Sequence, residues 1–259
     1  MKVARYHTLG GPEHIEVAEQ SAPTPAEGQL LVRVHATSVN PVDWKMASGA
    51  FPFNLMPPAL PYVPGFDVAG EVERAAGGFA VGDRVFVRKT ERAGGASAEL
   101  AVCDAGVAAA MPAGMSFHDA AAIPLAGMTA LQGLRDGARL PLSGADGWRV
   151  LIVGASGGVG HFATQIARDA GAHVTGVCSA RNADFVASLG AHAVIDYARD
   201  DAWNAAGNFD VILDCVGGKP VSRFTPLLTA RGAYACVMPG AGVFARQLVS
   251  ALAGPACAR

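Results

Sequence analysis

The stretch RVLIVGASGGVGHFATQIARDAGAHVTGV, residues 149–177, constrains the fold of this chain more than any other. A short apolar run at 150–153 leads into a glycine-rich turn, a helical pattern follows at 159–170, and a second β-branched run begins at His173. This order predicts a strand, a tight turn, a helix and a second strand. Such a unit holds dinucleotides in doubly wound folds.

The glycines stand where the pyrophosphate of a dinucleotide would lie. Gly154 permits the tight turn, Gly157 lets backbone N–H groups approach a phosphate, and Gly160 allows the helix to pack closely on the strand. The helix N-terminus adds partial positive charge. The pattern is a variant, G-A-x-G-G-x-G, and the alternative to a nucleotide site is a plain tight turn. The predicted pyrophosphate contacts are Gly154, Ala155, Ser156, Gly157, Gly158, Val159 and Gly160.

The composition indicates a substantial core and no highly charged partner. Of 259 residues, 51% are hydrophobic and 16% charged, so the chain is not a disordered one. The formal net charge of −2, without clustered Lys or Arg, argues against nucleic acid or an anionic membrane as partner. The sequence has neither a membrane-length apolar run nor the apolar core of a signal peptide. Its five cysteines are widely spaced and lack a C-x-x-C pair, so we expect reduced thiols in the cytoplasm.

The first half of the chain has the pattern of a β-rich domain. Apolar residues alternate in part at 30–36 and more clearly at 67–73, and residues 82–87 read as a turn leading into a short strand. Prolines between Pro52 and Pro64 predict a loop-rich crossing there.

From about residue 120 the pattern changes to alternating helices and strands. A helical composition at 120–134 is interrupted by Pro124 and Gly127. The predicted strands are 150–153, 173–177, 193–195, 209–213 and 233–237, and the predicted helices between them are 159–170, 182–189 and 221–228. This alternation implies a parallel sheet covered on both faces. With the glycine turn after its first strand, the expected strand order is 3-2-1-4-5.

The end of the second strand predicts which dinucleotide binds. NAD sites carry an acidic residue about 20 positions beyond the glycines, where it holds the ribose 2′-hydroxyl. Residues 176–182, GVCSARN, contain no acid. Ser179 can hydrogen-bond a 2′-phosphate and Arg181 can pair with it, which favours NADPH over NADH. In the alternative, Ser179 caps the next helix and Arg181 is merely solvated.

Several motifs in one order resemble the medium-chain dehydrogenase/reductases, specifically their zinc-independent quinone oxidoreductase branch. The resemblance implies an α/β protein with a GroES-like β-rich catalytic domain at 1–122 and a Rossmann NADP-binding domain at 123–259. It also implies an active site in the cleft between them. The matching segments cover nearly the whole chain: SVNPVDWKMASG (38–49), PGFDVAGEV (64–72), GDRVF (82–86), AAIPLAGMTALQGL (121–134), the glycine turn, RNADFVASLGAHAVIDY (181–197) and FDVILDCVGG (209–218).

The resemblance also bears on zinc, because relatives of this fold bind catalytic zinc through Cys, His and Cys. Those three positions fall on Asn40, Phe66 and Leu125. Phe and Leu offer no donor atom, and an amide is a poor zinc ligand beside thiolate or imidazole. The four-cysteine structural zinc loop is absent as well. We therefore expect no zinc.

Without a metal, the suited chemistry is hydride addition to a conjugated acceptor, since the resulting enolate needs only modest stabilisation. The resemblance thus implies NADPH-dependent reduction of a quinone or an α,β-unsaturated carbonyl. One alternative is an alcohol dehydrogenase or enoyl reductase-like activity on another carbonyl. Another is a catalytically silent nucleotide-binding protein, such as a redox sensor or a lens-type structural protein.

Three candidate catalytic residues lie in the first half. The resemblance places Asn40 near the nicotinamide and substrate, with satisfaction of backbone groups before Pro41 as the alternative. Asp43 could act as an acid, although a turn or helix cap is the commoner role for such a residue. Tyr62 could hydrogen-bond a substrate carbonyl, whereas its proline-rich surroundings favour packing.

The second half contributes further candidate cofactor contacts. The resemblance places Thr129 at a phosphate or ribose of the cofactor, the alternative being a mid-helix hydroxyl bonded to a preceding carbonyl. Tyr197 could border the adenosine 2′-phosphate or simply pack. Cys215, Val216 and Gly217 follow the fourth strand, at the carboxyl edge where ligands bind in such sheets.

The family pattern normally continues beyond residue 259, with a sixth Rossmann strand and a return segment completing the catalytic domain. We therefore expect a C-terminally truncated product. The homodimer usual in the family is doubtful for it, because the missing strand normally supports the dimer and its loss exposes a strand edge.

Overall fold

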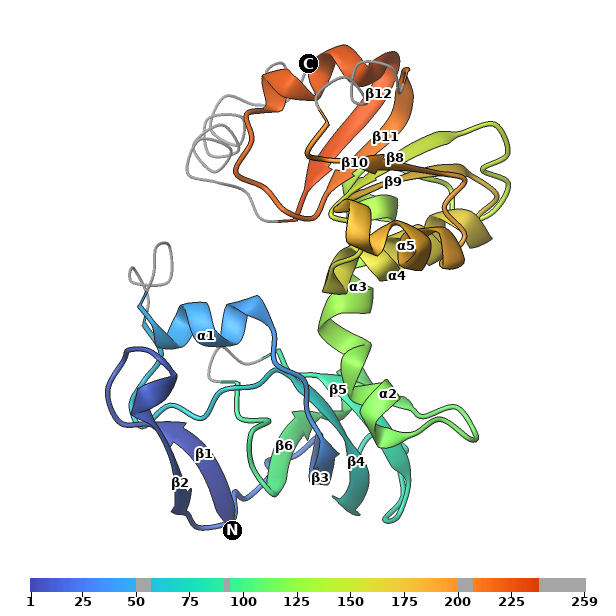
Figure 1. The fold of residues 1–259 in the computed structure, drawn as a ribbon. Coiled ribbons are helices and arrows are strands. Elements are labelled where there is room, and N and C mark those ends of the chain that lie inside the picture. Colours follow the sequence, from blue (N-terminus) through green and yellow to red (C-terminus); the bar gives the residue numbers. More distant parts are fainter. Residues whose placement is uncertain (50–56, 91–93, 200–206, 238–259) are drawn as a thin grey trace, which may run out of the picture. The chain divides into compact units, whose positions relative to one another are not determined.

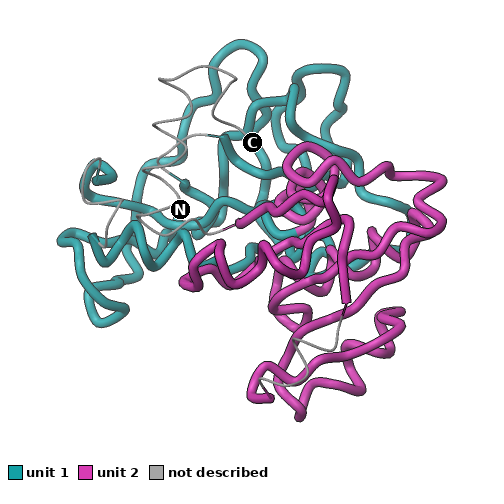
Figure 2. Tube along the Cα trace, turned by 90° about the horizontal axis from the view of Figure 1, so that it is seen from above, with its two compact units in different colours: residues 1–126 teal, residues 127–259 magenta. Residues whose placement is uncertain are grey.

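The computed structural model of the chain describes residues 1–49, 57–90, 94–199 and 207–237. It divides into two compact units, unit 1 at residues 1–126 and unit 2 at residues 127–259, coloured teal and magenta in Figure 2. The elements of unit 1 are β1 (Lys2–Tyr6), a 3-10 turn (Pro12–His14), β2 (Ile15–Glu19), β3 (Gln29–Ala36), α1 (Pro41–Ala47), β4 (Asp67–Arg74), β5 (Arg84–Arg88), β6 (Leu100–Asp104), a 3-10 turn (Ala105–Val107), β7 (Ala108–Ala110) and α2 (Phe117–Ala122).

Unit 1 is built on a curled antiparallel sheet with the strand order β6-β3-β4-β5-β7, the half-barrel of a GroES-like domain (Figure 1). Alternate residues of its strands turn inward, including Leu30 and Val32 on β3 and Val68 and Val72 on β4, all of them buried. The three predicted strands are confirmed as β3, β4 and β5. The turn before β5 places Gly82 at a φ of +92°, a conformation that favours glycine.

The helical stretch predicted at 120–134 is split into separate pieces. α2 ends at Ala122, α3 spans Pro124–Gln132, and a π-helical turn follows at Gly133–Gly137. Pro124 opens α3, where its missing N–H costs nothing, and it would interrupt a continuous helix. The predicted interruption at Pro124 is therefore confirmed, whereas the one predicted at Gly127 is wrong, because α3 continues through that residue.

Unit 2 is a five-stranded parallel sheet with helices. Its elements after the π-helical turn are β8 (Arg149–Val153), α4 (Gly158–Asp169), β9 (His173–Cys178), a 3-10 turn (Ala180–Asn182), α5 (Ala183–Ser188), β10 (Ala193–Asp196), β11 (Phe209–Asp214), two 3-10 turns (Val221–Arg223 and Thr225–Leu227) and β12 (Leu228–Cys236). The strand order is β10-β9-β8-β11-β12 (Figure 1). Numbered along the chain, this is the predicted order 3-2-1-4-5.

Both faces of this sheet are covered, as continuous apolar strands require. On β8, Val150 and Ile152 pack in one cluster that includes Ala163 and Ala167 of α4. Leu151 and Val153 point to the other face, into a second cluster. The expected α/β class, a GroES-like unit followed by a Rossmann-type sheet, is thereby confirmed.

One predicted helix, at 221–228, is wrong. The segment forms two short 3-10 turns, and β12 begins already at Leu228. Pro226, inside the second turn, has no N–H to donate, and its ring would clash with the carbonyl one turn earlier in an α-helix. The apolar spacing of the segment survives as packing, because Phe224 and Leu227 are buried under the sheet.

Within the described residues, Cys103, Cys178, Cys215 and Cys236 form no disulfide. In the described part of the chain, every helix is too short or too polar to cross a bilayer.

Candidate functional site

The glycine turn of unit 2 is held by its backbone. The N–H groups of Gly154 and Ala155 both donate to the carbonyl of Val177 on β9, each at 2.9 Å. Gly154 has a φ of +78°, and a Cβ there would lie 2.6 Å from the Cγ2 of Val216. This position therefore requires glycine both for its backbone conformation and for the close approach of the β11–β12 connection.

Gly160 is the most confined glycine of the turn. A Cβ there would lie 2.1 Å from the carbonyl oxygen of Gly154 and 2.8 Å from the Cα of Ala155. The close contact predicted between helix and strand is thus a contact between α4 and the turn itself. Around Gly158, in contrast, nothing lies within 4 Å of an added Cβ.

The start of α4 has the features of an anion site. The residue before it, Gly157, is the N-cap and supplies no side-chain hydrogen bond. The first N–H groups of a helix have no partner within the helix, and the dipole of the 12-residue α4 adds positive potential at that end. Ser156 accepts a hydrogen bond from the Nδ2 of Asn182 at 3.1 Å, which connects the turn to the start of α5. A pyrophosphate fits this cradle.

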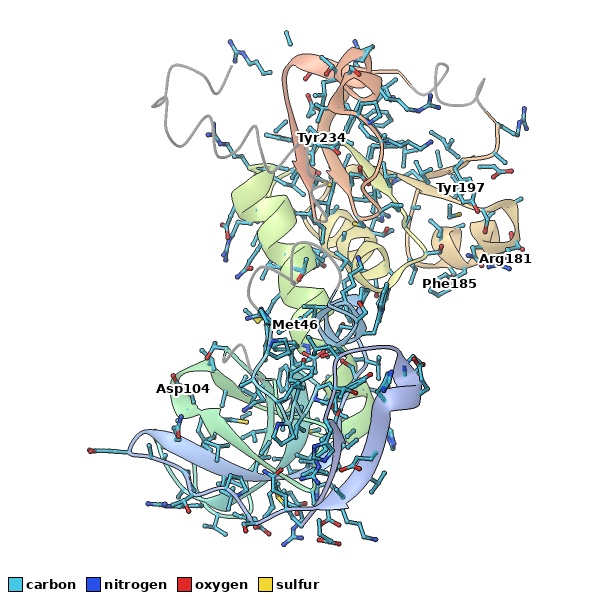
Figure 3. All side chains as sticks on the ribbon, turned by 90° about the vertical axis from the view of Figure 1, so that its left-hand side faces the viewer. Met46, Asp104, Arg181, Phe185, Tyr197 and Tyr234 are labelled. Atoms are coloured by element: carbon cyan, nitrogen blue, oxygen red, sulfur yellow. The ribbon has the colours of Figure 1, made fainter. Side chains whose placement is uncertain are left out.

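The ends of β9 and β10 bring the predicted 2′-phosphate residues to one side of unit 2. The backbone N–H of Tyr197 donates to the carbonyl of Cys178 at 3.1 Å. Arg181 is exposed and forms no ion pair among the described residues, and Tyr197 is 56% exposed, so its ring does not pack in the core. Figure 3 labels both side chains on the side of unit 2 that carries α5. Ser179 precedes the 3-10 turn but makes no side-chain capping bond, which removes the capping alternative.

The turn after β11 is organised by one buried carboxylate. Asp214 accepts hydrogen bonds from the N–H groups of Val216 and Gly217, at 3.0 and 2.9 Å, and from the hydroxyl of Tyr234 at 2.9 Å. Gly217 has a φ of +72° and Val216 is 63% exposed. Burial and the charge of Asp214 raise the pKa of Cys215 to about 12, which disfavours the nucleophilic thiolate form.

The structure brings this turn against the glycine turn. The N–H of Cys215 donates to the carbonyl of Val153 at 3.0 Å, and Val216 faces Gly154. The two predicted groups of cofactor contacts therefore form one surface at the carboxyl edge of the sheet. Thr129 lies on α3 and is half-buried. Its role at the cofactor stays a prediction.

In unit 1, the positions aligned with zinc ligands surround a carboxylate. The Nδ2 of Asn40 donates to the Oδ2 of Asp67 at 2.7 Å and to the Oγ of Ser38 at 2.8 Å. The Oγ of Ser38 donates to the same Oδ2, and the N–H of Leu125 donates to Oδ1 at 2.8 Å. We call Ser38, Asn40, Asp67 and Leu125 the Asp67 clasp.

The third aligned position, Phe66, is 6% exposed in an apolar cluster with Tyr6, Met46 and Tyr62. Together, an amide already bound to a carboxylate, a phenyl ring and a leucine are not a donor set for zinc. Nor does any other group of three His, Cys, Asp or Glu side chains within the described ranges have the spacing to hold a metal ion. The residues present do not fit the catalytic zinc of the wider fold.

Asp43 has the bonds of a helix cap. Its carboxylate accepts from the N–H groups of Asn40 and Gly65, at 2.7 and 3.0 Å, at the start of α1. Burial raises the pKa of Asp43 and likewise that of Asp67. The hydrogen bonds that each carboxylate accepts act in the opposite direction, as does the charge of Arg88 on Asp67, so both acids are satisfied within the fold.

Tyr62 is enclosed in the same apolar cluster. It is 1% exposed and stacks on Tyr6 with the ring centroids 6.2 Å apart. Its hydroxyl has no hydrogen-bond partner in the described part of the chain, and burial raises its pKa. This arrangement favours the packing alternative, and a contact with substrate stays a prediction.

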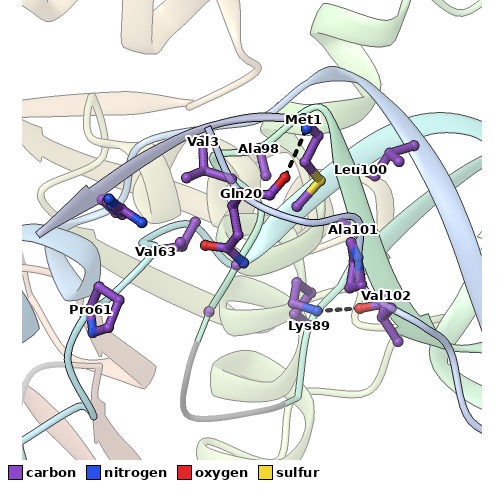
Figure 4. A pocket seen from close by; sticks show the side chains of 14 residues that line it. Met1, Val3, Gln20, Pro61, Val63, Lys89, Ala98, Leu100, Ala101 and Val102 are labelled. Carbon is purple, nitrogen blue, oxygen red and sulfur yellow. Dashed lines mark hydrogen bonds between the residues drawn. The ribbon is translucent and has the colours of Figure 1, made fainter. Parts of the chain in front are cut away.

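Unit 1 also has a cavity of about 550 Å³ that contains none of the predicted site residues (Figure 4). Its walls include Val3, Val63 and Leu100. The amine of Lys89, 6% exposed, donates to the carbonyl of Val102 at its border. The buried charge is thereby directed at the backbone of β6.

Sequence reasoning missed Ser38, Asp67 and Tyr234. Asp67 stands directly after Phe66, where zinc relatives have the last residue of G-H-E, and Ser38 opens the SVNP motif. The positions of Asp67 and Ser38 within these motifs could be read from the sequence. Their hydrogen bonds could not, because the partners lie far away in the sequence. No pattern in the chain connects Tyr234 to Asp214.

Comparisons with known proteins agree with both units. Residues 26–129 match the family described as alcohol dehydrogenase GroES-like domain, and residues 158–245 match the family described as zinc-binding dehydrogenase. A chloroplast envelope quinone oxidoreductase homolog from Arabidopsis thaliana is 39% identical over 253 residues, which cover 93% of this chain and 75% of the relative.

Solved structures extend the comparison. A quinone oxidoreductase from Coxiella burnetii superposes with a TM-score of 0.81 at 29% identity, covering 90% of this chain and 74% of the other. A mycobacterial protein solved in complex with NADPH superposes with a TM-score of 0.76 at 31% identity, covering 90% and 72%. The present chain is shorter than each of these proteins.

Proposed function

This chain belongs to the quinone oxidoreductase branch of the medium-chain dehydrogenase/reductases, and from that premise we propose that it reduces a quinone or an α,β-unsaturated carbonyl with NADPH and without zinc. As a member of this branch it is a nucleotide-binding oxidoreductase acting on a small molecule. The single observation that supports the zinc-free part is the Asp67 clasp, in which two of the three positions aligned with metal ligands, Asn40 and Leu125, donate hydrogen bonds to a buried carboxylate.

The chain offers specific residues for the cofactor. The turn from Gly154 to Gly160 and the N-terminus of α4 would hold the pyrophosphate, because backbone N–H groups and the helix dipole face an anion there without obstructing side chains. The Asp214 turn would support the nicotinamide half through Val216 and Gly217.

The choice of NADPH is supported by the side chains at the end of β9. Ser179 makes no capping bond, Arg181 has no ion-pair partner among the described residues, and residues 176–182 contain no acid. An arginine and a hydroxyl can bind a 2′-phosphate with charge-assisted hydrogen bonds. The similar mycobacterial protein that was solved with NADPH is consistent with this choice.

When bound, NADPH supplies hydride for the β-carbon of a conjugated acceptor. The negative charge then spreads into the oxygen of the substrate, which needs less stabilisation than the alkoxide of a simple ketone. We assign to Asn40 a position beside the reacting groups, with solvent delivering the proton. Within unit 1, Phe66, Met46 and Tyr62 belong to one buried apolar cluster.

A turnover assay with a metal control tests the proposal. We expect loss of NADPH absorbance with a panel of small quinones and enones, unchanged after dialysis against a zinc chelator. Elemental analysis should find no stoichiometric zinc. Binding of NADPH without turnover of any acceptor would support the silent alternative, and loss of activity on chelation would refute the zinc-free mechanism.

Replacing Arg181 tests the cofactor preference. Arg181→Ala should raise the KM for NADPH about tenfold and leave the KM for NADH unchanged, because only the 2′-phosphate loses a partner. Arg231→Ala, at another exposed arginine of unit 2, is the matched control and should change neither value. Equal wild-type kcat/KM for NADPH and NADH would contradict the preference.

A further inference from the structure

Asn182 occupies a helix-cap position but makes no capping bond. It is the N-cap residue of α5, where asparagine is favoured because its side-chain oxygen can accept from the first free N–H groups of a helix. No such side-chain bond forms here. The Nδ2 of Asn182 donates instead to the Oγ of Ser156, 26 positions earlier in the chain, at 3.1 Å. A bond to the glycine turn thus takes the place of a local bond that would stabilise α5.

This bond leaves the hydroxyl hydrogen of Ser156 for another acceptor. A serine hydroxyl can donate once and accept twice, and its oxygen here accepts from Asn182. An amide nitrogen only donates, so the hydrogen of Ser156 cannot point back at it. Among the described residues this half-buried hydroxyl donates to none. Ser156 directly precedes Gly157, the N-cap of α4, so its hydroxyl donor lies next to the helix end that attracts an anion.

Close packing around β9 brings α5 and the glycine turn together. Gly176 lies between them, because a Cβ there would be 2.5 Å from the Cγ1 of Val186 on α5 and 3.0 Å from the Cβ of Ala155 in the turn. Val186 and Ala155 are both fully buried in one apolar cluster. The bond between Asn182 and Ser156 is therefore the polar contact of an interface that is already closely packed.

The residues just before Asn182 are the ones predicted to bind the 2′-phosphate. Arg181 is exposed and forms no ion pair with a described residue, and Ser179 is half-buried without a capping bond (Figure 3). The backbone N–H of Asn182 donates to the carbonyl of Ser179 at 2.9 Å, which closes the short turn that carries both residues. The bond from Asn182 to Ser156 consequently fixes this short turn relative to the glycine turn.

We propose that Asn182 is a positioning residue for NADPH, which through Ser156 couples the site of the pyrophosphate to the site of the 2′-phosphate. The amide itself touches neither group. It turns the Ser156 hydroxyl into a donor for the pyrophosphate and holds Arg181 and Ser179 in place for the 2′-phosphate. This inference rests on the proposed function, which puts NADPH on this edge of unit 2. It adds that the preference for NADPH depends on a residue outside both contacts.

Equilibrium binding of NADPH and NADH, followed by their fluorescence, tests the coupling without turnover. Asn182→Ala should weaken NADH about threefold and NADPH about tenfold, because the pyrophosphate loses an oriented donor and the 2′-phosphate also loses a fixed partner. The ratio of the two affinities then falls about threefold. A residue that only stabilised the fold would weaken both cofactors equally, so an unchanged ratio would overturn the proposal.

Ser188→Ala is the matched control. Ser188 lies on the same helix, and its hydroxyl donates to the carbonyl of Phe185. This variant therefore also removes one side-chain hydrogen bond of α5, but one that does not reach the glycine turn. Both affinities should stay at their wild-type values. A fall of the ratio in Ser188→Ala like that in Asn182→Ala would assign the effect to a general loosening of α5 and contradict the coupling.

A double-variant cycle tests the pairing itself. Ser156→Ala should lower the ratio as Asn182→Ala does and weaken both cofactors further, because the donor itself is gone. Adding Asn182→Ala to Ser156→Ala should cause no further loss, since Asn182 acts only through Ser156. Additive losses would overturn the pairing and leave the proposed function intact. A wild type that binds neither cofactor would refute the proposed function, and this inference with it.

Discussion

The two sites of this molecule are built by opposite means. In unit 2 the glycine turn works because side chains are missing: Gly160 leaves no room for a methyl group, and the atoms nearest to one, those of Gly154 and Ala155, lie within the 149–177 stretch. In unit 1 the Asp67 clasp works because side chains from residues 38, 40 and 67 converge with the backbone of residue 125. A site shaped by the backbone of one short segment can be recognised from its sequence motif. A site made of side chains from distant segments forms only when the chain folds.

Substitutions in the glycine turn and in the Asp67 clasp should also differ in how much they destabilise the protein. A turn packed against its own backbone has no way to yield when an atom is added, because backbone atoms cannot rotate aside. A clasp of hydrogen bonds loses one contact at a time and keeps the others. Substitutions in the turn are therefore expected to cost more than substitutions in the clasp.

The largest expected effect is that of Gly160→Ala. Its new methyl group would meet the Gly154 carbonyl and the Ala155 Cα, so the free energy of unfolding should fall by about 3 kcal/mol. NADPH binding, followed by its fluorescence, should be lost with it. Gly158→Ala is the control, since nothing lies within 4 Å of its new methyl group, and its stability should stay within about 0.5 kcal/mol of the wild type. If both variants behaved alike, the turn would not be shaped by Gly160.

Removing one donor from the clasp should have a smaller effect. Ser38→Ala leaves one N–H of Asn40 without its acceptor and Asp67 with one donor fewer, and we expect a loss of about 2 kcal/mol in urea denaturation. NADPH affinity should remain, because the pyrophosphate cradle lies in unit 2. A Ser38→Ala protein as stable as the wild type would show that the clasp contributes orientation without stability.

The smallest effect is expected for Tyr234→Phe, which tests whether the turn after β11 in unit 2 depends on the carboxylate of Asp214. Tyr234→Phe removes one of the three donors to Asp214, and the two backbone donors remain. We expect a loss of about 1 kcal/mol in thermal unfolding, together with a modest rise in the KM for NADPH as the Val216–Gly217 turn loosens. Phe224→Leu, beside the same ring, serves as a packing control, because it should lower stability without changing the KM for NADPH.

Sequence patterns predicted the parallel sheet well because its strands are apolar on both faces and its turns are marked by glycine. They failed at 221–228, where apolar spacing resembled a helix but Pro226 prevents one. For the unit 1 site, the residues aligned with zinc ligands indicated that the thiolate and imidazole donors of a zinc site are absent there. They did not indicate that Asp67 accepts hydrogen bonds from Asn40 and Leu125, since hydrogen-bond partners that are 27 to 58 positions apart leave no periodic signal in the sequence.

The sequence by itself determined the family, the order of the strands in unit 2 and the position of the glycine turn, because each depends on residues that are neighbours along the chain. Only the tertiary structure decided that Asp67 joins the segments that carry the positions aligned with zinc ligands and that Tyr234 supports the turn after β11. It also decided that the Asn40 amide turns its nitrogen inward. Those outcomes depend on which distant donors meet which buried acceptors, and a buried carboxylate must be satisfied by whatever donors the fold brings to it.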